Sequence, residues 1–221
     1  MPTFNYEFES LAGWALWVAP NPPHDLVTPE LNIEDTRTGA HPLAVHSGST
    51  SVRFVQHWST WHAGLMRQFP VTPLSLVKLS AWGRIWNVSS GTFPAPSDTN
   101  TDPWLRVGID YTGGVQPTSQ SVTWNELKVY DAWKLAEVQA VALANTVTVF
   151  VGFENGRTAK WDLQNMYAFL DSVQVIIEGA TPPPDPNPLP TPTIGGILTE
   201  SIEDRGEYFR VVQWWPKGKP G

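Results

Sequence analysis

Short segments in which apolar and polar side chains alternate recur along this chain, and they constrain its fold more than any other feature. The longest covers residues 76–86, and shorter ones cover 51–55, 105–111, 147–153 and 173–177. Pro, Gly, Asn and Asp residues cluster between them. Because successive side chains of a strand point to opposite faces, this period of two predicts strands. Many such strands separated by turn residues indicate an all-β sandwich.

One segment is ambiguous, because residues 131–144 are rich in Ala and Leu, as a helix would be. Within it, Val138, Ala140 and Ala142 alternate with polar or small neighbours. We therefore expect a loop that leads into a strand.

The composition excludes several classes of protein. Hydrophobic residues make up 41% of the 221, which is enough to build a core and too much for a disordered chain. The absence of Cys rules out disulfides, thiolate zinc sites and thiol catalysis. The formal net charge of −7 argues against nucleic acid and anionic membranes as partners. No apolar run approaches the roughly 18 residues of a membrane-spanning helix, and the first residues do not have the pattern of a signal peptide.

A proline-rich run, TPPPDPNPLPTPT, begins at Thr181 and favours an extended polyproline II conformation. We expect a domain over residues 1–179, a linker over 180–193 and an extended arm over 194–221. Residues 208–215 (YFRVVQWW) within the arm have the composition of a strand. The arm is therefore either the start of a further segment or an element that pairs with a neighbour.

The polar faces of two predicted strands, 76–86 and 104–111, carry tryptophan and arginine in place of ordinary surface residues. The other face of each strand is apolar and is expected to face the core. The side chains concerned are Trp82, Arg84, Trp86, Trp104, Arg106 and Asp110. If the two strands are neighbours in a concave sheet, these side chains form one amphipathic platform. An indole ring stacks on the apolar face of a sugar ring, while Arg and Asp bind its hydroxyl groups.

The alternative is that loops cover these tryptophans, which then fill a second small core. The interleaved arginines argue against this alternative, because burying an unpaired Arg is costly. Three further aromatic residues are either second-line ligand candidates or core residues: Tyr111, Trp124 and Trp133.

The sequence contains no recognisable catalytic constellation. His57 and His62 flank a Trp-Ser-Thr-Trp segment, but their spacing does not match a zinc site, so we expect surface histidines. A nucleophile elbow and a phosphate-binding loop are both absent from the sequence. Acidic residues are present, but nothing pairs two of them as glycoside hydrolysis requires. The sequence therefore favours binding over catalysis.

Several short motifs occur in the order typical of a known family. They are NYEFE at 5–9 with Gly13-Trp14, HSGSTSVRF at 46–54, WHAGLMRQF at 61–69 with LSAW at 79–82, VTVFV at 147–151 and LDSV at 170–173. Over residues 4–177 the chain resembles carbohydrate-binding modules of the galactose-binding-like jelly-roll type, the group that includes xylan- and glucan-binding modules. The resemblance implies a jelly roll that binds polysaccharide without catalysis. The chain departs from the group at Tyr6, where Gly is usual, and in a Pro-rich insertion over 20–42.

In that group a structural Ca²⁺ often joins the first strand to the last. The resemblance implies Glu9 and Asp171 as ligands, with Glu7 a weaker candidate and backbone carbonyls near Gly48 in addition. Carboxylate and carbonyl oxygens are the ligands that Ca²⁺ prefers. The alternative is that Glu9 and Asp171 are simply exposed acids.

The sequence thus predicts a non-catalytic module that binds a polysaccharide or cell-surface glycan outside the cell or on a cell or virion surface. The alternative is a structural subunit of a virion, such as a decoration or tail-fibre protein, or of an extracellular filament. In that case, self-assembly proceeds through residues 194–221, which pair with a neighbouring subunit.

Overall fold

The structure is a computed structural model of the chain. It describes residues 1–19, 28–57, 60–88, 93–94, 96–98, 103–155 and 165–179. The predicted linker and arm, 180–193 and 194–221, lie outside the described residues, so both stay predictions.

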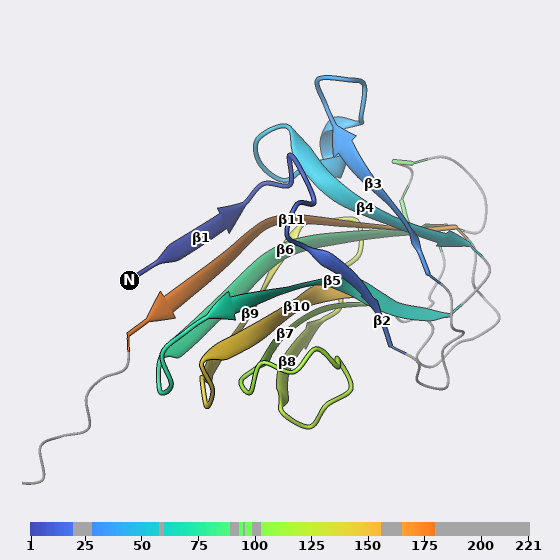
Figure 1. The fold of residues 1–221 in the computed structure, drawn as a ribbon. Helices are drawn as coiled ribbons and strands as arrows, with labels where there is room; N and C mark the ends of the chain where they lie inside the picture. The colour runs from blue at the N-terminus through green and yellow to red at the C-terminus, as the bar shows by residue number, and fades with distance from the viewer. Residues whose placement is uncertain are drawn as a thin grey trace, which may run out of the picture. The chain divides into compact units, whose positions relative to one another are not determined.

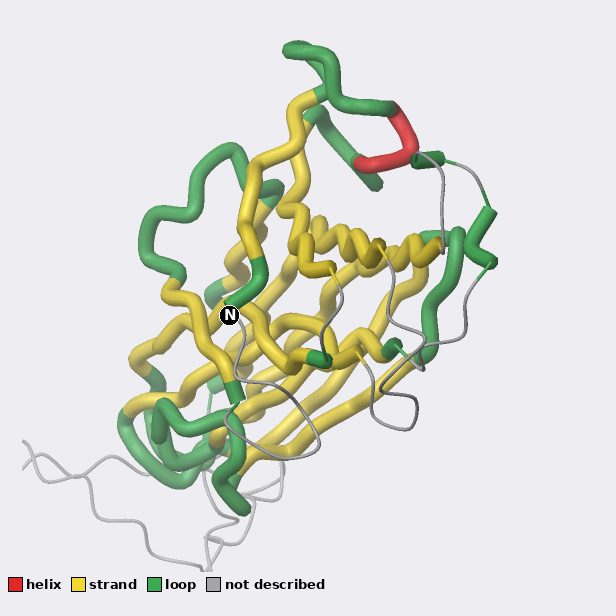
Figure 2. Tube along the Cα trace, turned by 90° about the vertical axis from the view of Figure 1, so that its right-hand side faces the viewer, coloured by secondary structure: helices red, strands yellow, loops and turns green. Residues whose placement is uncertain are grey.

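The described residues form eleven strands and one short 3₁₀ helix, η1 (Pro42–Ala44), which lies outside the sheets at one end of the sandwich (red in Figure 2). The strands are β1 (Thr3–Tyr6), β2 (Ala15–Val18), β3 (Glu30–Asp35), β4 (Thr50–His57), β5 (Trp61–Pro70), β6 (Leu76–Val88), β7 (Trp104–Asp110), β8 (Val122–Leu127), β9 (Lys134–Val141), β10 (Thr146–Asn155) and β11 (Asn165–Glu178). Each alternating segment of the sequence lies in or overlaps one of them, and the ambiguous segment 131–144 contains β9. The prediction of an all-β fold is confirmed.

Two antiparallel sheets make up the sandwich (Figure 1). Sheet A has the order β3-β4-β11-β6-β9, with β1 also pairing with β11, and sheet B has the order β2-β5-β10-β7-β8. Neighbours such as β4, β11 and β6 are far apart in sequence, as expected for a jelly roll rather than a chain of hairpins. In the part of the chain that the structure describes, no helix has the length and apolar character needed to cross a membrane.

The inward faces of the two sheets share one core. Val77, Leu79 and Ile85 of β6 and Leu105 and Val107 of β7 are at most 1% exposed. The sequence therefore predicted correctly which faces of β6 and β7 turn toward the shared core. At the contact between the sheets, Gly83 of β6 leaves room for Leu105, because a Cβ at Gly83 would lie 2.8 Å from both Leu105 methyl carbons.

We expect Gly83→Ala to lower the free energy of unfolding by about 1–3 kcal/mol, because the added methyl group overpacks the contact with Leu105. Equilibrium urea denaturation measures the change. Gly179→Ala is the control, since nothing lies within 4 Å of a Cβ there. A loss in Gly83→Ala no larger than in the control would contradict this account of the core.

Candidate functional site

The two predicted halves of the aromatic platform lie on opposite sides of the sandwich. We call Trp82, Arg84 and Trp86 the β6 triplet, and Trp104, Arg106 and Asp110 the β7 triplet. Strand β6 belongs to sheet A and β7 to sheet B, and both turn their apolar face toward the shared core. The two triplets therefore point away from each other, and the prediction of a single platform is wrong. Alternation predicts which side chains face outward, but not to which sheet a strand belongs.

The β6 triplet is largely covered by neighbouring side chains. Trp86 is 1% exposed, with its ring 5.0 Å from Tyr167 and 5.5 Å from Phe93 between centroids. Arg84 is 7% exposed, and its guanidinium carbon lies 5.9 Å from the centre of the Phe93 ring. Burial lowers the pKa of Arg84, although nearby Asp131 opposes this effect. Trp86 and Arg84 thus form a buried layer, which corrects the expectation that they contact a ligand.

Trp82 is only half-buried, but one of its faces is already occupied. Its ring stacks on His46 at a centroid distance of 4.0 Å and an interplanar angle of 17°. Trp133, a second-line candidate, packs edge-on against the same His46 at 5.5 Å. The aromatic residues at this end of sheet A therefore contact one another.

Arg106 of the β7 triplet lies at the centre of a charged cluster on the outer face of sheet B. Its Nη2 is 2.7 Å from Glu126 Oε1, and its Nη1 is 3.3 Å from Glu154 Oε2 and 2.8 Å from His62 Nε2. Because Arg can only donate, His62 accepts in this contact. The guanidinium lies 4.4 Å from the centre of the Trp124 ring. We call these five residues, His62, Arg106, Trp124, Glu126 and Glu154, the Arg106 cluster.

Glycines allow the aromatic rings on this face to lie directly against the backbone. A Cβ at Gly108 of β7 would lie 2.5 Å from the Trp124 ring, and one at Gly64 of β5 would lie 2.8 Å from Trp17. The Trp17 and Trp124 rings are consequently close, with centroids 6.1 Å apart. No sequence pattern indicated Trp17, Glu126 or Glu154 as a site residue. Glycine in the interior of a strand signals a close approach and was the available clue.

His62 is buried in the Arg106 cluster, which corrects the expectation of a surface histidine.

The other two residues of the β7 triplet, Trp104 and Asp110, lie outside the Arg106 cluster. Trp104 is half-buried, with Lys128 Nζ 4.8 Å from its ring centre. Asp110 is fully buried and accepts hydrogen bonds from Thr112 N, Thr112 Oγ1 and Ser121 Oγ at 2.7–2.9 Å. Asp110 therefore holds the loop after β7 together, which corrects its assignment as a ligand for hydroxyl groups.

The structure brings Glu7 and Asp171 together but leaves Glu9 apart. Asp171 Oδ2 accepts from the backbone N–H of His46 at 2.8 Å and of Ser47 at 3.1 Å. Glu7 Oε2 accepts from Ser47 Oγ at 2.6 Å. Glu9 is exposed and instead lies 3.9 Å from Arg37 Nη1. The ranking that placed Glu9 above Glu7 is not supported by this arrangement.

Asp171 lies where β11 changes one of its neighbours. β11 pairs with β4 up to Leu170 and with β1 from Val173, and its register with β6 shifts between Asp171 and Gln174. Such a bulge redirects side chains. The Asp171 carboxylate is thereby held against the loop that precedes β4.

Burial raises the pKa of Asp171 to about 6; three backbone N–H donors oppose this effect, and the charge of Glu7 adds to it. Among the described residues, no three Asp, Glu, His or Cys side chains are grouped to hold a metal ion. A cation here would thus need two carboxylates together with neighbouring hydroxyl and carbonyl oxygens. This all-oxygen donor set is of the type that fits Ca²⁺.

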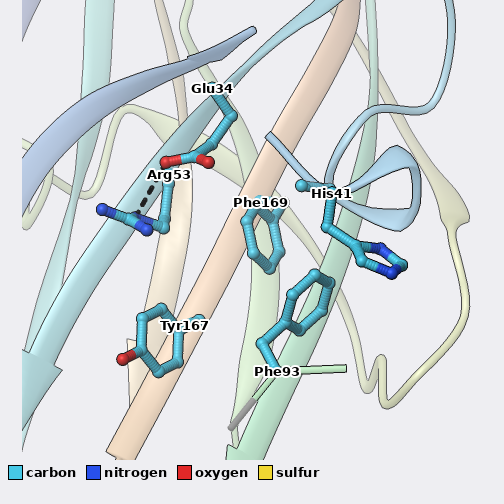
Figure 3. Close-up of a pocket in the computed structure, with 7 residues that line it drawn as sticks. Glu34, His41, Arg53, Phe93, Tyr167 and Phe169 are labelled. Carbon is cyan, nitrogen blue, oxygen red and sulfur yellow. Dashed lines mark ion pairs between the residues drawn. The ribbon is translucent and has the colours of Figure 1, made fainter. Parts of the chain in front are cut away.

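A pocket of about 200 Å³ opens on the outer face of sheet A (Figure 3). It is lined by Glu34 of β3, His41, Ala44 of η1, Arg53 of β4, Phe93, and Tyr167 and Phe169 of β11. Arg53 Nε lies 3.1 Å from Glu34 Oε1, and the Arg53 guanidinium carbon lies 5.6 Å from the centre of the Tyr167 ring. Arg53 lies on the polar face of the predicted strand 51–55, so the alternation of this segment already indicated that its side chain points outward. The first half of β11 was not among the predicted strands.

Comparison with known proteins gives matches in fold alone. No family model and no curated protein sequence matches the chain. The adhesin domain K1 of Lys-gingipain from Porphyromonas gingivalis W83 is similar to the structure, with a TM-score of 0.51, 14% identity and coverage of 81% of this chain and 100% of that one.

Two carbohydrate-binding modules are also among the similar structures. The CBM22-1 xylan-binding domain of Paenibacillus barcinonensis Xyn10C has a TM-score of 0.44 and 14% identity, and the match covers 81% of this chain and 95% of that one. TmCBM61, solved with β-1,4-galactotriose, has a TM-score of 0.48 and 12% identity, with coverage of 76% and 90%.

We expect the stability of the domain to depend on pH through Asp171. Its pKa of about 6 in the folded state lies above the ordinary 3.8, so the folded state holds the proton more tightly. The stability contributed by this group is fully present below about pH 4 and is lost as the pH rises to about 6, by roughly 3 kcal/mol. Thermal unfolding at several pH values without divalent cations, compared with Asp171→Asn, measures this contribution. If the difference in stability between the unmodified chain and Asp171→Asn stays constant from pH 4 to 7, the pKa of Asp171 is not raised by folding.

Proposed function

We propose that the domain is a non-catalytic glycan-binding module and that it binds sugar at the Arg106 cluster on the outer face of sheet B. The observation that carries the proposal is the placement of one guanidinium between two carboxylates and over an indole ring. A sugar's hydroxyls need both donors and acceptors, which the guanidinium and carboxylate supply, and the part of the half-buried Trp124 ring that Arg106 leaves uncovered offers apolar surface beside them.

The ion pairs of the cluster support binding over catalysis. Glu126, whose side chain is 27% exposed, can accept a hydrogen bond from a ligand, whereas the buried Glu154 pairs with the guanidinium and holds it in place. Side chains that are already held in place lose little conformational freedom when a ligand binds. Neighbouring strands supply the groups, since Arg106 of β7 is paired with Glu126 of β8 and with Gly152 of β10. The site is therefore built on the rigid part of the fold.

Trp124→Ala is expected to weaken binding of a recognised glycan at least about tenfold, or about 1.4 kcal/mol, because it removes the ring beneath the guanidinium. Isothermal titration against soluble xylans, glucans, galactans and peptidoglycan fragments measures the affinity. Trp82→Ala, on the opposite sheet, is the matched control and should bind as the unmodified chain does. The proposal fails if no glycan gives heat, or if Trp82→Ala loses binding and Trp124→Ala does not.

We further propose that a structural Ca²⁺ is held by Glu7 and Asp171. Three features support this: the two carboxylates lie close enough to interact, Ser47 and Ser172 hydroxyls lie between them, and together they join the segment after β1 to β11. A cation there would offset the repulsion between the two carboxylates. Its role would be structural, since the site is apart from the Arg106 cluster.

Addition of Ca²⁺ at about 1 mM, the affinity range of extracellular modules, is expected to raise the melting temperature at pH 7. Glu7→Gln keeps the shape of the side chain but removes a charged ligand, so the rise should disappear in that variant. Glu9→Gln is the matched control and should respond as the unmodified chain does. An equal response of Glu7→Gln and Glu9→Gln, or no response of the unmodified chain, would rule out this site.

The alternative function, a structural subunit that assembles through residues 194–221, stays a prediction because those residues lie outside the described part of the chain. One feature of the sandwich favours it. Leu74, Val141 and Leu143 are about half exposed on adjoining segments, where Leu74 N donates to Ala142 O. This apolar patch lies beside Leu76, which pairs with Glu178 near the end of β11. A location outside the cell or on a virion surface accords with either function and likewise stays a prediction.

A further inference from the structure

We propose that the pocket on the outer face of sheet A is a second sugar site, which takes a single neutral sugar ring. It shares no residue with the Arg106 cluster, so it does not require that cluster to bind. The conclusion that the domain has two sugar sites also depends on the proposed function of the Arg106 cluster. The proposal is carried by the aromatic lining of the pocket and by the Arg53–Glu34 pair on one of its sides (Figure 3).

Aromatic rings supply the apolar surface of the pocket. Phe169 is almost fully buried, and its ring centre lies 5.2 Å from that of Phe93. His41 packs edge-on against Phe93 at 5.4 Å, and Tyr167 stands beside Arg53. Figure 3 shows Phe169 and Phe93 between the Arg53–Glu34 pair on one side and His41 on the other, with Tyr167 below Arg53. A sugar ring that enters the pocket meets aromatic surface on its C–H side.

The Arg53–Glu34 pair supplies a donor and an acceptor next to each other. The two side chains come from neighbouring strands, β4 and β3, and are 29% and 15% exposed. Although Arg53 Nε is 3.1 Å from Glu34 Oε1, the geometry is not that of an aligned hydrogen bond, and Nε has no other hydrogen-bond partner. Nε itself is buried, so the exposed parts of the two side chains, and not this nitrogen, supply hydrogen-bonding capacity for a ligand. Each side chain can bind one of two adjacent hydroxyls, with Arg53 donating and Glu34 accepting.

Charge and size define the class of ligand. The opposite charges of Arg53 and Glu34 offset each other, so the pocket offers a charged sugar no net attraction and suits a neutral ring. Its volume of about 200 Å³ is smaller than the roughly 300–1,000 Å³ of pockets that hold drug-sized molecules. We therefore expect a chain end or a side branch to enter, rather than the interior of a polymer.

The position of the pocket has a functional consequence. It opens on the outer face of sheet A, while the Arg106 cluster lies on the outer face of sheet B, with the core between them. One sugar ring cannot reach both. Two sites that face opposite ways allow one module to bridge two glycan chains, whereas one flat glycan surface cannot contact both sites at once.

The test is an NMR titration of the full chain with neutral methyl glycosides of xylose, galactose, glucose and mannose, and with methyl glucuronide. We expect at least one neutral glycoside to shift the backbone amides of Glu34, Arg53 and Tyr167 in a saturable way, and methyl glucuronide to bind more weakly. Glu34→Gln, which keeps the side-chain shape, and Arg53→Met should each weaken this response at least about tenfold. Trp124→Ala, on the other sheet, should leave it unchanged.

The outcomes separate the two proposals. If no neutral glycoside shifts the amides of the pocket, or if Glu34→Gln responds as the unmodified chain does, the pocket is not a sugar site. Shifts confined to the Arg106 cluster would overturn the pocket and support the proposed function. Shifts confined to the pocket would support this inference and leave the proposed function without support. Because Glu34→Gln is nearly isosteric, its result decides the question even if Arg53→Met fails to fold.

Discussion

The packing of one apolar sheet face on another is the interaction on which the rest of this structure depends. The inward side chains of β6 and β7 meet in a single core, and Leu105 fits into the space that Gly83 leaves. Once those faces are turned inward, every alternate side chain must point out of the sandwich. The aromatic and charged residues of the two sheets are thereby sent to opposite sides of the molecule.

The outer faces are themselves partly covered, and this explains why so many tryptophans occur in a chain of this size. On sheet A, Phe93 packs against Trp86 and lies over Arg84. On sheet B, Trp17 and Trp124 lie against the glycines of β5 and β7. The prediction of a second small core was thus closer to the structure for Trp86 than the prediction of a ligand contact. The two candidate sites lie where the side chains packed on the outer faces include charged groups, at the Arg106 cluster and beside Arg53.

The carboxylate pair Glu7 and Asp171 illustrates how strand pairing positions a polar group in an otherwise apolar fold. β11 pairs first with β4 and then with β1, and Asp171 lies at the change between them. There it is fully buried and accepts backbone hydrogen bonds from the loop before β4. The family resemblance implied Asp171 as a metal ligand, and that assignment stays a prediction. It did not rank Glu7 above Glu9, because the direction of the chain after β1 decides which of the two acids turns toward Asp171.

The sequence by itself determined the strands that alternate clearly, such as β6, β7 and β10, and the faces that they turn to the core, since alternation is a local property that acts through the geometry of each strand. It identified Arg106 and Trp104 as outward residues on that basis. Only the tertiary structure decided that β6 and β7 belong to different sheets, and that Arg106 meets His62, Glu126 and Glu154. It also created the pocket by placing β11 beside β4 and β3, which lie more than 100 residues earlier in the sequence. Partners of this kind depend on how distant strands pair around a common core, and no local pattern records that pairing.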